Sequence, residues 1–108
     1  MRDEFPDDVD GETLRRVVDA GADLLRPMVI NFSVAAPDEA AARAIATIVA
    51  AVGFDPSLGE DEKSKAWSVY CSKSMLATYD GVVAEQIVLA ALVAPHGGAY
   101  EGWGTFGN

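Results

Sequence analysis

Apolar side chains occupy every second position in two segments of the chain, residues 28–35 and 66–73. They are Ile30, Phe32 and Val34 in the first segment, and Trp67, Val69 and Cys71 in the second. Alternation of this kind is typical of strands with one buried face and one solvated face. The polar faces favour an antiparallel sheet covered on one side over a parallel sheet covered on both.

Helical spacing of apolar residues marks three other segments, at about residues 10–20, 37–52 and 79–94. Asp8 or Asp10 can cap the first helix, and Thr78 caps the third. Pro37 suits the first position of the second helix, because the N–H that proline lacks has no helical partner there. Residues that favour helix termination follow the three segments: Gly21, Gly53, and Pro95 with Gly97 and Gly98.

The second and third helices differ in the burial that they predict. In the second, the core face consists of Ala41, Ile45, Ile48 and Val52. The third has no polar side chain after Gln86, through the run IVLAALVA. Because a helix that is apolar all round must bury more than one face, we expect its last two turns to be deeply packed or to lie in a contact between copies of the chain.

Two further strands are predicted at residues 54–58 and 99–106. Pro56 places the first at a sheet edge or a bulge, because proline cannot donate a ladder hydrogen bond. The last strand is rich in glycine, and its aromatic residues do not share one parity, which predicts a bulge or kink. Those aromatic residues are Tyr100, Trp103 and Phe106.

The resulting order is a leading helix followed by β-α-β-β-α-β. Split βαβ units in this order form a four-stranded antiparallel sheet with both crossover helices on one face. We therefore predict an α+β, ferredoxin-like fold with an additional N-terminal helix. The docking site of that helix does not follow from the pattern. With 108 residues, the chain is predicted to hold an acidic N-terminal arm (residues 1–9) and a single domain (residues 10–108).

The composition adds a strong negative charge: the chain has 17 acidic and 8 basic residues, and its net charge is −9. The acids gather at the front of the chain: Asp3, Glu4, Asp7, Asp8, Asp10, Glu12, Asp19 and Asp23. Such a surface repels nucleic-acid backbones and attracts basic protein segments, although acids also serve solubility alone. The longest apolar run is too short to span a membrane. A lone cysteine and the lack of a leader predict a soluble protein of a reducing cytoplasm.

Candidate chemistry is sparse. His96 and Cys71 could form a base and nucleophile pair, but Cys71 shares the apolar face of its predicted strand and is better read as a small buried hydrophobe. One histidine and one cysteine offer no metal-ligand spacing. The glycines near the chain end follow a helix and have no lysine or arginine after Lys73, unlike a phosphate loop. We expect no cofactor, no metal and no catalysis.

Three stretches resemble a known family: DGETLRRVVDAGADL (10–24), CSKSM (71–75) and, most specifically, HGGAYEGWGTF (96–106). They are similar to the regulator of ribonuclease E activity B family, the ribonuclease E inhibitors. The resemblance implies a ferredoxin-like domain without catalysis, in a bacterial cytoplasmic protein that binds ribonuclease E and lowers or redirects its RNA cleavage. Relatives in that family can carry a long acidic tail after this last stretch, whereas here the acids gather at the front.

The partner predicted from charge and resemblance together is a basic region of a ribonuclease E type endonuclease. The candidate partner-binding residues are Asp3, Glu4, Asp7, Asp8, Asp10, Glu12, Tyr100, Glu101 and Trp103. An alternative is a small-ligand sensor domain with a pocket near the apolar end of the third helix. A hydrolase using Cys71 and His96 is a further alternative, which requires the two side chains within about 3 Å of each other.

Overall fold

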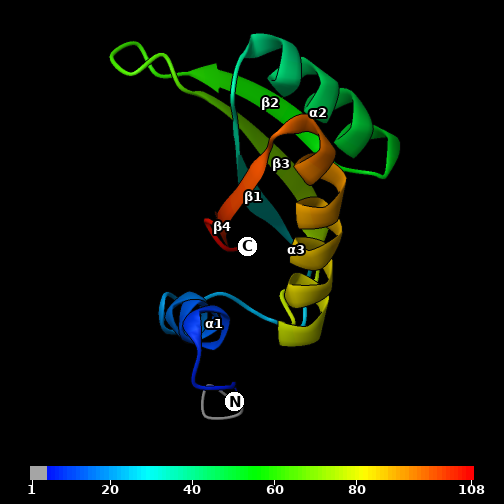
Figure 1. The fold of residues 1–108 in the computed structure, drawn as a ribbon. Helices are drawn as coiled ribbons and strands as arrows, with labels where there is room; N and C mark the ends of the chain where they lie inside the picture. Colours follow the sequence, from blue (N-terminus) through cyan, green and yellow to red (C-terminus); the bar gives the residue numbers. More distant parts are fainter. Residues whose placement is uncertain (1–4) are drawn as a thin grey trace.

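A computed structural model describes residues 5–108. Its four strands form one antiparallel sheet in the order β2-β3-β1-β4. The strands are β1 (Met28–Ala36), β2 (Asp55–Glu60), β3 (Trp67–Met75) and β4 (Ala99–Gly104). This order, with a helix between β1 and β2 and another between β3 and β4, confirms the predicted α+β, ferredoxin-like arrangement. The hairpin between β2 and β3 projects beyond the rest of the molecule (Figure 1).

Helices α2 (Glu39–Ala51) and α3 (Tyr79–Val93) cover one face of the sheet (Figure 1). The predicted cap Thr78 accepts a hydrogen bond from the Gly81 N–H at 3.0 Å. A short 3₁₀ helix, Ala94–His96, follows α3 and ends at Gly97 in the left-handed conformation. Helix α1 (Val9–Asp19) packs against α3 at one end of the sheet, which settles the docking that the pattern left open.

The core lies between the sheet and the helices. Its fully buried side chains include the three apolar residues predicted for β1, together with Val69 and Cys71 of β3. Phe32 and Phe54 meet edge to face, with ring centroids 5.8 Å apart. Helix α1 contributes Leu14 and Val17 to the same core. The leading helix is therefore an integral part of the domain.

The start of α2 corrects one prediction. Asp38, not Pro37, marks the boundary: Asp38 is the cap, its carboxylate accepts the Ala41 N–H at 2.8 Å, and the helix begins at Glu39. Pro37 therefore precedes the cap instead of taking the first helical position. The buried face is also rotated from the predicted one and consists of Ala42, Ile45 and Val49. In a helix so rich in alanine, apolar periodicity has little contrast, so several faces fit the pattern equally well.

The end of α3 is less buried in the chain than predicted. Leu89 and Val93 are buried, but Ile87 is 66% exposed and Val88 is 43% exposed. The prediction that the last two turns of α3 are buried on all sides is therefore wrong for a single chain. A contact between copies of the chain stays a prediction.

Strand β4 contains the predicted bulge. The register with β1 shifts between Ser33 and Val34: Tyr100 pairs with Val34 and Gly102 with Ser33, so Glu101 is the additional residue. Gly102 has φ 148°, a value that only glycine adopts readily. The strand ends at Gly104, two residues before the predicted end. The neighbouring edge prediction is confirmed, because β2, with Pro56, lies at the other edge of the sheet.

Candidate functional site

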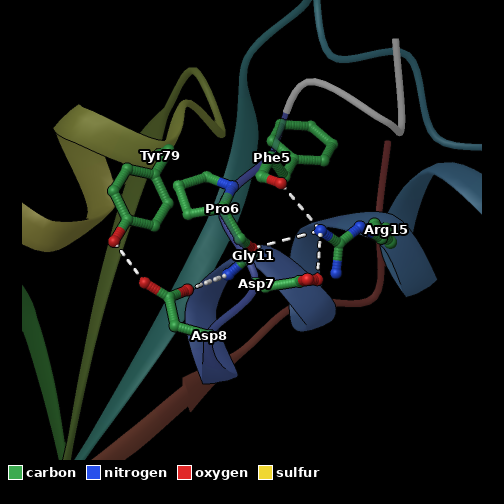
Figure 2. A network of polar contacts seen from close by, with 7 residues as sticks. All are labelled: Phe5, Pro6, Asp7, Asp8, Gly11, Arg15 and Tyr79. Atoms are coloured by element: carbon green, nitrogen blue, oxygen red, sulfur yellow. Dashed lines mark hydrogen bonds and ion pairs between the residues drawn. The ribbon is translucent and has the colours of Figure 1, made fainter.

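The acids at the start of α1 form hydrogen bonds within the domain (Figure 2). Asp8 caps α1, and its Oδ1 accepts the Gly11 N–H at 2.8 Å. Its other carboxylate oxygen accepts a hydrogen bond from the Tyr79 hydroxyl, at the first residue of α3. One side chain thus both begins α1 and joins it to α3.

These bonds shift the pKa values of both partners. The Tyr79 hydroxyl, with the Gly11 N–H as a second donor, lowers the pKa of Asp8, because both bonds favour the ionised carboxylate. The same bond raises the pKa of Tyr79, because ionisation of the phenol would remove the donor. Asp8 is therefore a carboxylate and Tyr79 a neutral phenol across the physiological range.

Arg15 of α1 holds the segment that precedes the helix (Figure 2). Its Nη2 donates to the backbone carbonyl oxygens of Phe5 at 2.7 Å and Pro6 at 3.2 Å. The same nitrogen pairs with the carboxylate of Asp7 at 3.2 Å. Asp7 is 99% exposed, so this ion pair contributes little to stability, whereas the two carbonyl bonds fold residues 5–7 back onto α1.

Asp10 connects α1 to β4. The Trp103 Nε1–H donates to its Oδ1 at 2.9 Å, although the two residues are 93 positions apart in the chain. The bulge makes this possible: the residue added at Glu101 brings Tyr100 and Trp103 to the same, helix-covered face, where both pack against the core. Tyr100 and Trp103, the aromatic residues of the YEGWG motif, therefore mainly make contacts within the domain.

The Tyr100 hydroxyl is the one buried side-chain polar atom without a hydrogen-bond partner within residues 5–108. Burial, and to a lesser extent the Asp10 carboxylate, raises the pKa of Tyr100, so the phenol stays neutral. Its ring fills space beside α1 and β4 and offers little surface to a partner.

The predicted partner-binding residues thus fall into separate groups. Asp3 and Glu4 lie outside the described residues. Asp7, Asp8 and Asp10 have partners in the domain, and Tyr100 and Trp103 are half-buried. Glu12 on α1 and Glu101 in the β4 bulge are exposed. The structure brings Asp10, Tyr100 and Trp103 together, while the exposed acids lie on different elements.

Sequence reasoning missed a second surface, the open face of the sheet. Tyr70 stands on it with 45% of its surface exposed, and Phe106, just after β4, is fully exposed. A hollow of about 500 Å³ lies between them, lined by Asn31, Tyr70, Gly104, Thr105 and Phe106. Tyr70 alternates with Val69 and Cys71 along β3 and so lies on the opposite face from them, but the position of Phe106 depends on the bulge and on the chain after β4.

Of the two residues considered for catalysis, Cys71 belongs to the core. Cys71 is fully buried in the core, and burial raises the pKa of its thiol to about 11, which leaves almost no thiolate at neutral pH. His96 ends the 3₁₀ helix that follows α3. Within the described part of the chain, no three histidine, cysteine, aspartate or glutamate side chains are grouped as a metal site would require.

A model of one protein family, described as Regulator of ribonuclease activity B, matches residues 7–105. The chain belongs to this family. The match begins just before the capping acid Asp8 and ends just after β4, so it includes the bond between Asp10 and Trp103 that joins α1 to the sheet. Membership of the family makes the protein a regulator of ribonuclease activity. None of the curated proteins matches the chain. Among the described helices of this family member, none is both long and apolar enough to cross a bilayer.

Proposed function

We propose that the protein binds a ribonuclease E type endonuclease and lowers or redirects its cleavage of RNA, without catalysing a reaction itself. The family match over residues 7–105 carries this proposal, because a regulator of ribonuclease activity must act on a nuclease or on its access to RNA. The proposed setting is a bacterial cytoplasm, where a lone cysteine stays reduced.

The net charge of −9 supports contact with the nuclease over contact with its RNA substrate. Binding to nucleic acid depends heavily on lysine and arginine side chains that displace counterions from phosphates. An acidic surface would instead meet the basic, RNA-binding regions of a nuclease, and the attraction would speed the encounter. The regulator would then compete with RNA for those regions.

The distribution of the acids refines the proposal. Asp8 and Asp10 already accept hydrogen bonds from Tyr79 and Trp103, so their main contribution is to hold α1 in place. Glu12 projects from α1 and is exposed, which makes it the better candidate for a charge contact. We propose that nuclease binding uses α1 as an acidic face on the domain.

The test uses the purified protein and a purified ribonuclease E type endonuclease, with RNA cleavage and binding affinity both measured. We expect binding at 0.05 M NaCl that weakens strongly by 0.3 M, because surface charges are screened over about 10 Å at 0.1 M salt. We also expect slower or redirected cleavage of an RNA substrate. Absence of both binding and any change in cleavage would refute the proposal.

A matched pair of variants tests the acidic face of α1. Glu12→Lys and Glu62→Lys change the net charge equally, but Glu62 lies in the hairpin between β2 and β3. We expect Glu12→Lys to weaken nuclease binding by about tenfold and Glu62→Lys to weaken it much less. Equal effects would indicate that net charge, and not the α1 surface, controls the interaction.

A further inference from the structure

The open face of the sheet carries small, uncharged side chains over most of its area. Register and alternation assign to it Asp55, Ser57 and Gly59 of β2, Ser68, Tyr70, Ser72 and Ser74 of β3, and Val29, Asn31, Ser33 and Ala35 of β1. Lys73 belongs to the opposite side, where it pairs with Glu85 of α3 at 3.2 Å. No lysine or arginine is among the described strand residues that face the open side.

A groove lies on this face between Tyr70 of β3 and the end of β4. The hollow of about 500 Å³ between Tyr70 and Phe106 adjoins a second, of about 380 Å³, that extends along Ser33, Gly102 and Glu101. Both hollows are lined by Asn31, Tyr70 and Gly104, so they form one continuous depression. The Ser72 hydroxyl donates to the Asn31 side-chain oxygen at 2.7 Å, which fixes the polar centre of its floor.

Gly104 leaves the floor of the groove open, and Gly59 leaves room for the Tyr70 ring. A Cβ atom added at Gly104 would have no heavy atom within 4 Å, and the φ of Gly104 is not in the left-handed region. Neither backbone conformation nor packing therefore requires glycine there, and its effect is to leave the floor bare. At Gly59 an added Cβ would lie 3.4 Å from Tyr70 Cε2, so the Tyr70 ring leans across the space that this glycine leaves.

The charges at the edges of the face indicate the kind of occupant. Asp55 of β2 and Glu101 of β4 are exposed at opposite edges, separated by three interstrand spacings, or about 15 Å. An extended peptide covers that distance in four to five residues. Tyr70 offers a ring on which a guanidinium can stack. RNA would need cations beside the aromatic ring, and the described open face has none.

We propose that this groove binds an extended, arginine-containing peptide segment of the nuclease, with a guanidinium stacked on Tyr70 and basic side chains directed to Asp55 and Glu101. This inference rests on the proposed function and assigns the contact to the sheet in addition to α1. Apolar side chains of the peptide would fill the hollow between Tyr70 and Phe106.

The first experiment measures affinity for the full-length nuclease. Tyr70→Ala removes the stacking ring and Gly104→Val fills the floor, and we expect each to weaken binding at least tenfold. The controls are Ile87→Ala and Ala90→Val, which make similar changes at exposed positions of α3, on the opposite side of the sheet. We expect these to stay within twofold of wild type. Thermal unfolding verifies that every variant is folded.

The second experiment uses probes, so that failure of the groove and failure of the proposed function are distinguishable. A labelled ten-residue peptide with two arginines four positions apart, among alanines and leucines, should bind wild type and shift the amide resonances of Asn31, Tyr70 and Gly104. A matched peptide with glutamates in place of arginines should not. A ten-nucleotide oligouridylate is the nucleic-acid probe.

The outcomes separate as follows. If the nuclease binds wild type and the groove variants equally, the groove inference is overturned while the proposed function stands. If the nuclease does not bind at all, the proposed function fails, and the peptide probe decides the groove by itself. Resonance shifts with oligouridylate but not with the arginine peptide would also overturn the inference, in favour of RNA.

Discussion

At the scale of single residues, the acids near the start of the chain are distinguished by what they bind. Asp8 links the first turns of two helices through the Gly11 N–H and the Tyr79 hydroxyl. Asp10 holds the indole of Trp103. Glu12, on the same helix, is exposed to solvent. Neighbouring acids therefore have different roles: Asp8 and Asp10 hold α1 in the domain, and Glu12 contributes charge to the surface.

The bond between Asp8 and Tyr79 predicts a pH dependence. The pKa of Asp8 is lowered in the folded protein, so the stability it contributes is present above the ordinary carboxylate pKa, about 3.9, and is lost as the pH falls through the folded value. The pKa of Tyr79 is raised, so its contribution is present below about pH 10 and is lost above the folded value.

Tyr79→Phe should therefore lower the free energy of unfolding most between about pH 5 and 9, with a difference from wild type that shrinks toward pH 2.5. Urea denaturation at a series of pH values measures this. Tyr70→Phe, which removes the same atom on the open face of the sheet, should show no such trend. A Tyr79→Phe deficit that is unchanged between pH 6 and 2.5 would contradict the assignment of the bond.

At the scale of elements, β4 depends on its bulge. The additional residue at Glu101 lets Tyr100 and Trp103 share one face, and Gly102 supplies the backbone conformation. The pattern of aromatic parity predicted an irregularity here, but not its consequence, the anchoring of α1 through Trp103. That contact joins residues 93 positions apart, and no local pattern encodes a pairing at that separation.

Substitution of the two nearby glycines should separate backbone strain from packing. Gly102→Ala should lower the free energy of unfolding by roughly 1–3 kcal/mol, because alanine rarely adopts φ 148°. Gly104→Ala, on the same strand with an ordinary φ, should be neutral or slightly stabilising. Urea denaturation of both variants measures the difference. Equal losses would show that the bulge does not need glycine.

At the scale of the whole molecule, element order was readable from the sequence because strand alternation and helix signals were strong at Ile30, Phe32 and Thr78. The face of α2 was not, because alanine gives little contrast between buried and exposed positions. The groove on the open face depends on where Phe106 lies after the bulge, and that is set by tertiary structure. Local sequence patterns thus predicted the order of helices and strands. The groove depends on contacts between residues distant in the sequence, which those patterns do not encode.

The charge of the whole molecule predicts an effect of salt on stability. With a net charge of −9 at pH 7, the compact state is destabilised by self-repulsion. Raising NaCl from 0.01 to 0.2 M shortens the screening length from about 30 Å to under 10 Å, so the melting temperature should rise by a few degrees. Near the isoelectric pH of about 4.3 the same salt change should have little effect. Calorimetric scans measure both; a rise of equal size at the two pH values would exclude self-repulsion as the cause.

The contact between Trp103 and Asp10 gives the protein an intrinsic optical label. An indole whose N–H is held by a carboxylate and whose ring is half-buried emits differently from one in water, so release of α1 from β4 would change the fluorescence of Trp103 directly. The second tryptophan, Trp67, begins β3 and can be replaced to leave a single emitter. Attachment of the first helix can then be followed in real time while the partner binds, without any added dye.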